Sequence, residues 1–196
     1  MKKICLPLVS LLLSTLVLCL LPTEAEAGIY EDTVRLHILA DSDKEEDQNI
    51  KLAVRDALLL TYAQELSLCQ KEERDAFFTE KLGEIQEFVD AKLSELGAPY
   101  VCSVSYGEEW YDTRVYEDFT LPQGTYTSLQ IKLGRARGKN WWCVMYPPLC
   151  LNLATDAPPD DALLGYNKQE VNLIQGGRYQ IKFKTLELLS SVFKKR

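Results

Sequence analysis

Residues 140–150, Asn-Trp-Trp-Cys-Val-Met-Tyr-Pro-Pro-Leu-Cys, constrain the fold of this chain more than any other stretch. The first seven residues are rich in aromatic and β-favouring side chains, which is typical of a buried or half-buried strand. Pro147 and Pro148 have no backbone N–H to donate to a neighbouring strand, so the strand must end there. The sequence therefore predicts a strand over 140–146 followed by a turn.

The two adjacent tryptophans of this strand point in opposite directions, because successive side chains alternate between the faces of a sheet. We expect one tryptophan in the core and the other facing solvent, a cleft or a partner. We favour Trp142 for the core and Trp141, with Tyr146 and the Pro147-Pro148 turn, for the contact. Exposed tryptophans are typical anchors of protein interfaces.

Two cysteines flank the proline turn, and a chain reversal there brings Cα atoms within the roughly 7 Å that a disulfide needs. We expect a Cys143–Cys150 bond on this basis, and Cys69–Cys102 as a second pair. An even number of cysteines in an exported chain favours disulfides over metal binding. The chain has one histidine and no C-x-x-C spacing, so we expect no zinc site and no cofactor.

The N-terminus has the order of a secretory signal: Lys2-Lys3, an apolar run over 4–21, and small residues in Ala25-Glu26-Ala27. Cleavage after Ala27 is one expectation. The apolar run is also just long enough for an uncleaved membrane anchor. In both cases the folded part leaves the cytoplasm. The expected layout is a signal segment (1–27), a domain (28–153), a linker-like segment (154–178) and a C-terminal strand and amphipathic helix (179–196).

The formal net charge of −7 argues against a nucleic-acid partner and against electrostatic docking on anionic lipid. Membrane contact is therefore expected only through the N-terminal segment or the basic C-terminal tail, which ends in Lys-Lys-Arg. The chain is long enough to bury one substantial core.

The hydrophobic period changes along the domain. Residues 33–40 alternate as a strand, and helical stripes follow to about residue 66 and over 72–96. From residue 100 the period is two, over 100–106, 110–119 and 125–133, and residues 134–138 look like a hairpin loop into the tryptophan strand. This pattern predicts an α+β fold: a mainly antiparallel sheet packed against a two-helix hairpin, in a single domain with an extra C-terminal segment.

The catalytic potential of the sequence is small. His37 is the only histidine, with Arg35 on the same strand face and Asp41 nearby. A histidine beside a carboxylate can act as a base, although its more common role is structural hydrogen bonding. The sequence has no G-x-S-x-G, no P-loop and no G-x-G-x-x-G. We therefore expect no enzyme; the alternatives are an exported cell-wall hydrolase that uses His37, or a glycan-binding module with Trp141, Trp142 and Tyr146 as its platform.

Three blocks of sequence point to one family: residues 140–150, residues 35–43 with their continuation through 47–57, and Pro122-x-Gly124-x-Tyr126. From about residue 34 to residue 151 the chain resembles the stage II sporulation protein R family. The resemblance implies a protein that is exported across the forespore membrane into the intermembrane space. There it would activate a membrane-embedded aspartic protease of the mother cell, which cleaves the sigma-E precursor. The partner-binding candidates are Trp141, Trp142, Tyr146, Pro147, Pro148, Arg35, His37 and Asp41.

Overall fold

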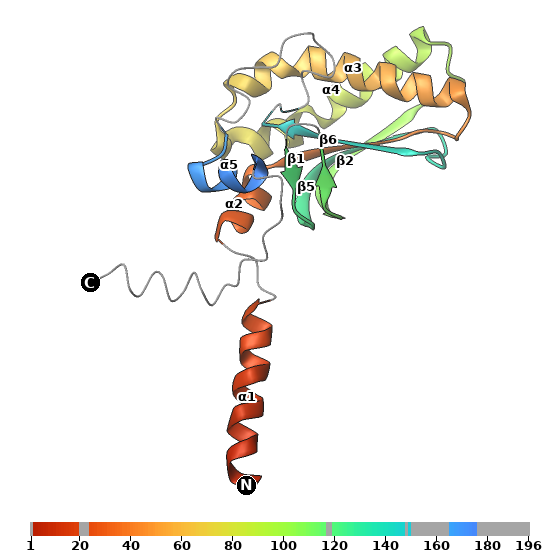
Figure 1. Ribbon diagram of the computed structural model, residues 1–196. Helices are drawn as coiled ribbons and strands as arrows, with labels where there is room; N and C mark the ends of the chain where they lie inside the picture. Colours follow the sequence, from red (N-terminus) through yellow and green to blue (C-terminus); the bar gives the residue numbers. More distant parts are fainter. Residues whose placement is uncertain (1, 20–23, 117–118, 148, 150–164, 176–196) are drawn as a thin grey trace.

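The computed structural model describes residues 2–19, 24–116, 119–147, 149 and 165–175. Within these ranges the protein is α+β, as predicted (Figure 1). The helices are α1 (Lys2–Cys19), α2 (Glu24–Asp32), α3 (Glu45–Leu68), the 3-10 turn η1 (Lys71–Glu73), α4 (Arg74–Glu95) and α5 (Lys168–Gln175). The strands are β1 (Val34–Leu39), β2 (Cys102–Tyr111), β3 (Arg114–Val115), β4 (Thr120–Leu121), β5 (Gly124–Leu133) and β6 (Asn140–Tyr146).

The main sheet has the strand order β2-β5-β1-β6 and is mostly antiparallel, with one parallel pair. β2 is antiparallel to β5 and β6 is antiparallel to β1, but β1 and β5 run parallel. β1 therefore lies between β5 and β6, which follow each other in the sequence. Its central position fits its burial, since five of its six residues are buried on both faces of the sheet.

The hairpin loop expected over 134–138 is wrong, because β5 and β6 do not pair with each other. The segment instead passes over the end of β1, where the backbone N–H groups of Arg137 and Gly138 donate to the carbonyls of Asp41 and Ala40 at 3.1 and 2.9 Å. A β-carbon on Gly138 would lie 2.2 Å from the Ser42 carbonyl oxygen. Only glycine fits this crossing.

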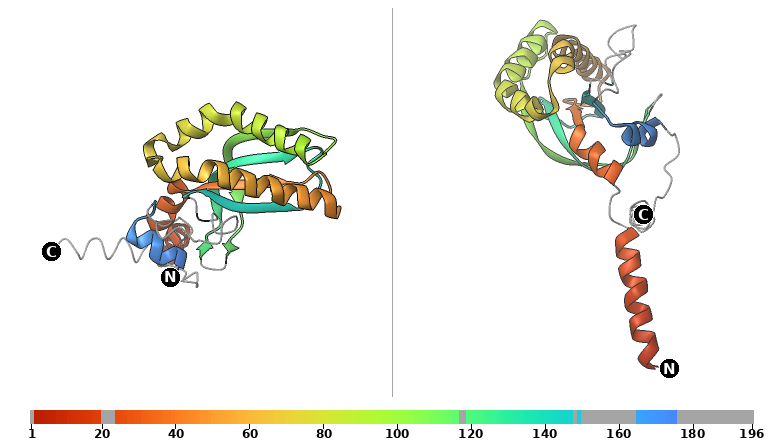
Figure 2. Two further views of the ribbon diagram at one scale, coloured as in Figure 1. Left: turned by 90° about the horizontal axis from the view of Figure 1, so that it is seen from above. Right: turned by 90° about the vertical axis from the view of Figure 1, so that its left-hand side faces the viewer.

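α3 and α4 cover one face of the sheet (Figures 1 and 2). The ring of Phe78 on α4 stacks on Tyr106 of β2 at 5.2 Å, and Tyr62 of α3 meets Phe88 of α4 at 6.0 Å. α4 ends at Glu95, and Gly97, which follows the C-cap residue Leu96, has a φ of +73° that suits glycine. Each aliphatic side chain buried here contributes about 1.5–3 kcal/mol. The core of this face includes Val34, Leu36, Ile38, Val54, Leu58, Ile85, Val89, Leu93, Leu129, Ile131 and Leu133.

The opposite face of the sheet is called here the second face, and it carries α2 and α5 at one end. α2 and α5 pack together there (Figure 1), and the Tyr166 and Thr33 hydroxyls share a hydrogen bond of 2.7 Å. α5 lies inside the segment 154–178 that the sequence suggests to be a linker. The fully buried Ile174 shows why it docks as a helix. The strand and helix expected over 179–196 lie outside the described residues.

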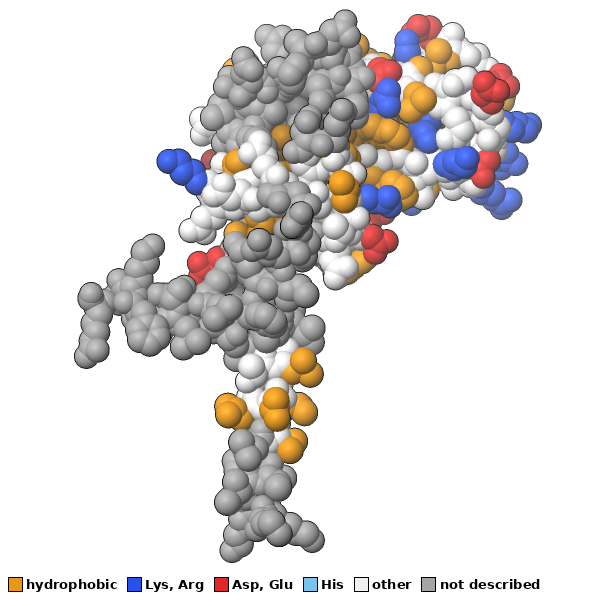
Figure 3. All heavy atoms as spheres, viewed as in Figure 1, with side chains coloured by type: hydrophobic (Ala, Val, Ile, Leu, Met, Phe, Trp, Pro, Cys, Tyr) orange, Lys and Arg blue, Asp and Glu red, His pale blue; other side chains and the backbone are white. Residues whose placement is uncertain are grey.

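α1 stands apart from the α+β unit (Figure 1), and its side chains between Val9 and Val17 are exposed (Figure 3). Among the described residues, no helix has the length and apolar character needed to cross a membrane.

Candidate functional site

His37 is the centre of a polar cluster on the second face. It lies on β1, and its ring nitrogens reach two other strands. Nδ1 lies 2.9 and 3.0 Å from the two carboxylate oxygens of Glu109 on β2, and Nε2 lies 3.0 Å from Oδ1 of Asn140 on β6. The side chain of His37 is only 9% exposed. His37 thus ties both edge strands of the sheet to the central strand.

The Glu109 carboxylate is itself held by neighbours. The Tyr111 hydroxyl donates to Oε2 at 2.7 Å and the Ser128 hydroxyl donates to the same oxygen at 3.2 Å. The Tyr111 and Ser128 hydroxyls lie 2.6 Å apart. Burial is the main cause that raises the pKa of Tyr111, so its hydroxyl stays protonated and remains a donor. The carboxylate is fixed from three sides.

Trp142 completes the cluster. Its ring stacks on the His37 ring at 5.4 Å with an interplanar angle of 24°. On its other side the Arg114 guanidinium of β3 lies 3.7 Å from the indole centroid, close enough for a cation–π contact. Trp142 is half-buried. We use the name His37 cluster for His37, Glu109, Tyr111, Ser128, Asn140 and Trp142.

Arg35 lies two residues before His37, on the same face, and is fully buried. Its Nε donates to the Cys143 carbonyl at 3.3 Å and its Nη2 donates to the Tyr116 hydroxyl at 2.9 Å. The guanidinium carbon lies over the rings of Tyr111 and Tyr126 at 4.3 and 5.1 Å. Arg35 is therefore packed inside the protein and does not present its charge to a partner.

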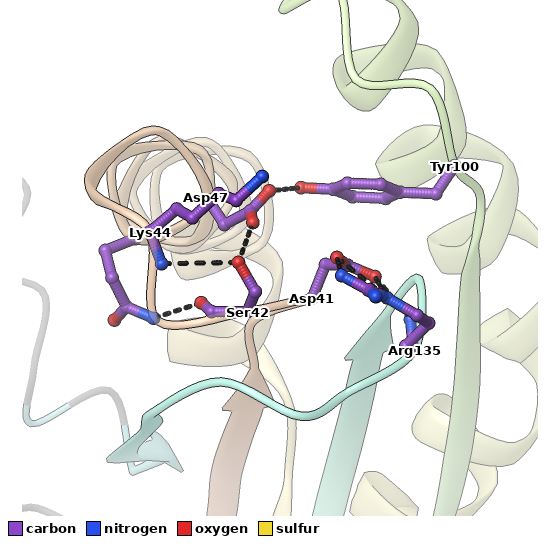
Figure 4. Close-up of polar contacts among 7 residues, drawn as sticks. Asp41, Ser42, Lys44, Asp47, Tyr100 and Arg135 are labelled. Atoms are coloured by element: carbon purple, nitrogen blue, oxygen red, sulfur yellow. Dashed lines mark hydrogen bonds and ion pairs between the residues drawn. The ribbon is translucent and has the colours of Figure 1, made fainter.

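Asp41 is also buried and is engaged within the chain (Figure 4). Arg135 binds it with its guanidinium at 2.6 Å and donates its backbone N–H to Oδ1 at 2.7 Å. These hydrogen bonds lower the pKa of Asp41 to about 2. Arg135 comes from the crossing segment after β5, so this ion pair fixes that segment to the end of β1.

The start of α3 is also linked to the residues that follow β1 (Figure 4). The Tyr100 hydroxyl donates to Asp47 at 2.8 Å, and the Ser42 hydroxyl donates to the other oxygen of the same carboxylate. The backbone N–H of Lys44 donates to the Ser42 hydroxyl oxygen at 3.2 Å. Asp47 thus joins the start of α3 to Ser42 and Tyr100.

The remaining candidates lie elsewhere. Trp141 is half-buried on the face that α3 and α4 cover, where the Arg55 guanidinium of α3 lies 4.9 Å from its ring. The two tryptophans thus occupy opposite faces, as predicted, but neither is the fully buried core residue that we expected Trp142 to be. Tyr146 and Pro147 are buried, so they form no exposed rim. Pro148 lies outside the described residues.

The two cysteine pairings expected from the sequence have different outcomes. Cys69 and Cys102 are free, so the second predicted pair is wrong. The Cys102 thiol contacts the Gln86 carbonyl at 3.7 Å, whereas Cys69 precedes the start of α4. The twelve helical steps from Arg74, at the start of α4, to Gln86 span about 18 Å, far beyond disulfide reach. Cys143 is disulfide-bonded. Cys150 lies outside the described residues, so the Cys143–Cys150 pairing stays a prediction.

Sequence reasoning missed Glu109, Tyr111, Ser128 and Arg114. The alternation of residues along the sequence places Glu109 and Tyr111 on one face of a strand. The alternation does not show that they lie near His37, because that depends on the pairing of β2 with β5 and of β5 with β1. The Ser128 hydroxyl bonds to Tyr111 and Glu109 rather than to His37, so the geometry lacks the contact that would activate a serine nucleophile. No group of His, Cys, Asp or Glu side chains in the described ranges is arranged to hold a metal ion.

The sequence profile of the stage II sporulation protein R family matches residues 30–156, which is more than half of the chain. The chain belongs to the stage II sporulation protein R family. A curated relative, stage II sporulation protein R of Bacillus subtilis (strain 168), is 34% identical over 125 residues. The aligned part covers 62% of this chain and 55% of the relative, so the chain spans about half the length of that protein. No solved structure is significantly similar to the chain.

Proposed function

We propose that the protein is a forespore-to-mother-cell signal that activates a membrane-embedded aspartic protease, which then cleaves the sigma-E precursor during endospore formation. The observation that carries this proposal is the family match over residues 30–156, which includes every residue of the His37 cluster. In this proposal the chain works by binding and has no turnover of its own.

The proposed site of action is the space between the forespore and mother-cell membranes. The signal-like order at the N-terminus, with two lysines, an apolar run and small residues, supports export. The acidic net charge of −7 disfavours adsorption to anionic lipid, so recognition of the protease has to come from specific contacts.

We assign the protease contact to the second face around the half-buried side chains of Trp142 and Arg114. Tryptophan and arginine are the residue types enriched at interface hot spots. The His37 ring supports Trp142 from one side and Arg114 covers the other, so the indole is held in one orientation before binding. Preorganisation of this kind lowers the entropy cost of association. Next to Arg114 on the same strand, Val115 is 79% exposed.

The test is reconstitution in a non-sporulating bacterium that makes the candidate protease and the sigma-E precursor. The expected result is precursor cleavage only when the full chain is co-expressed with its N-terminal segment. A matched variant without residues 2–21 should stay in the cytoplasm and give no cleavage. Cleavage without the chain, or equal cleavage with the cytoplasmic variant, contradicts the proposal. So does a purified protein that hydrolyses cell-wall material by itself.

A further inference from the structure

Gly28 of α2 and Glu170 of α5 meet where these two helices pack. A β-carbon on Gly28 would lie 2.1 Å from Oε1 of Glu170, so the carboxylate lies directly against the glycine Cα. The backbone nitrogen of Gly28 is one bond, about 1.5 Å, from that Cα. The structure therefore brings a buried carboxylate to the backbone of one particular residue near the N-terminus.

Glu170 is 2% exposed and has no ion-pair partner among the described residues. Its oxygens accept hydrogen bonds from the side-chain amide of Asn167 and, at 2.8 Å, from the Asn167 backbone N–H, which forms a capping box at the start of α5. The charged groups around it are Asp32 and Glu31 of α2 and Lys71 of η1, and Lys71 already pairs with Asp32. Burial raises the pKa of Glu170. A buried carboxylate without a cation is costly for the fold.

The sequence before Gly28 has the small residues of a signal-peptidase site, Ala25 and Ala27, at the positions that such an enzyme reads. Hydrolysis of the Ala27–Gly28 peptide bond consumes one water molecule. Ala27 leaves with a carboxylate, and Gly28 gains an amino group that takes up a proton at neutral pH, since α-amino groups have a pKa of about 7.7–8.0. Ile29 is fully buried, so the new N-terminus stays at the interface.

We propose that removal of residues 1–27 leaves an α-ammonium group on Gly28 that pairs with Glu170, which adds an ion pair between α2 and α5 that the precursor lacks. In the precursor the same nitrogen is a neutral amide inside α2, which runs from Glu24 to Asp32. After cleavage it carries the positive charge that Glu170 lacks. This inference rests on the proposed export.

The test uses the full chain with its own N-terminal segment, expressed in a secreting bacterium. The exported product is purified, and its first residue is identified by N-terminal sequencing. The expected first residue is Gly28. A different first residue, or retention of the uncut chain, overturns the proposal.

The ion pair is then measured by trace acetylation of the terminal amine with acetic anhydride at about pH 8, near the ordinary pKa of such a group. We expect the wild-type amine to react at least tenfold more slowly than that of Glu170→Gln, because the paired ammonium is protonated and shielded. Glutamine can still serve in the capping box, so the variant should fold. Glu31→Gln is the control, because Glu31 lies on α2 with Gly28 and its side chain is exposed. The terminal amine of this variant should react within twofold of the wild-type rate.

A glycine-initiated peptide gives a second reference that does not depend on any variant's folding. Equal rates for the wild-type protein and that peptide overturn the proposal, as do equal rates for wild type and Glu170→Gln. Acetylation does not involve the protease. A chain that protects its amine but triggers no precursor cleavage would therefore contradict the proposed function and leave the ion pair standing, and the reverse result would contradict only the ion pair.

Discussion

Replacing each of the two adjacent tryptophans by alanine separates a contact role from a scaffold role. Both side chains are half-buried, and each has an arginine over its ring, Arg114 at 3.7 Å from Trp142 and Arg55 at 4.9 Å from Trp141. A fully buried tryptophan loses about 3–5 kcal/mol on truncation, so half-burial gives about 1.5–2.5 kcal/mol. An exposed cation–π contact adds about 0.5–1 kcal/mol. We expect each variant to lose about 2–3.5 kcal/mol of unfolding free energy.

Protease activation should differ sharply between these two equally destabilised proteins. An interface anchor carries about 2 kcal/mol or more, which corresponds to about 30-fold in affinity. Trp142→Ala should therefore need about 30-fold more protein for half-maximal precursor cleavage, whereas Trp141→Ala should match wild type at equal folded concentration. Urea unfolding of the purified variants measures the stability, and the reconstituted cleavage assay measures activation. The assignment is refuted if both variants activate the protease equally at equal concentrations of folded protein. It is also refuted if Trp141→Ala loses more activation than Trp142→Ala.

Three further perturbations have defined outcomes. Arg135 holds the pKa of Asp41 at about 2, below the unfolded value of about 3.9. The ion pair therefore stabilises the fold above about pH 4, and its contribution disappears as pH falls through 2. In urea unfolding, Arg135→Ala should be less stable than wild type at pH 7, and the difference should shrink as the pH falls toward 2 and below. Mass mapping under non-reducing conditions should find Cys143 joined to Cys150, and its reduction should cost about 2–3 kcal/mol, whereas detection of both as free thiols contradicts that pairing. His37→Ala should lose about 1–3 kcal/mol of unfolding free energy, because it leaves hydrogen-bond partners in the His37 cluster unsatisfied. We expect no hydrolytic activity in the wild-type protein, and a hydrolytic rate that is present in wild type and vanishes in this variant is the contrary result.

The local elements of this fold were predictable because each has its own pattern. Alternation of Val34, Leu36 and Ile38 defines β1, and the apolar stripe that includes Ile85 and Val89 defines α4. Gly97, with its positive φ, follows the C-cap of that helix. These signals depend on residues close together in the chain, and local propensity and burial act in the same direction.

The arrangement of the strands was not predictable from the same signals. β1 inserts between β5 and β6, a long-range choice to which the turn composition at Gly134 and Gly138 gives no clue. This insertion decides which residues meet His37: it places Glu109 and Asn140 on its two ring nitrogens. The sequence therefore singled out His37 and Trp142 but not the partners that hold them.

The central claim is that the protein activates the protease by binding it. The most direct test adds the purified processed protein to lipid vesicles that contain the protease and the sigma-E precursor. The protein is added outside, on the side that corresponds to the intermembrane space, and precursor cleavage is followed with increasing protein concentration. The account predicts a cleavage rate that rises from background and saturates, with a matching curve for Trp141→Ala and a strongly right-shifted curve for Trp142→Ala. A cleavage rate that is independent of the added protein would contradict the account.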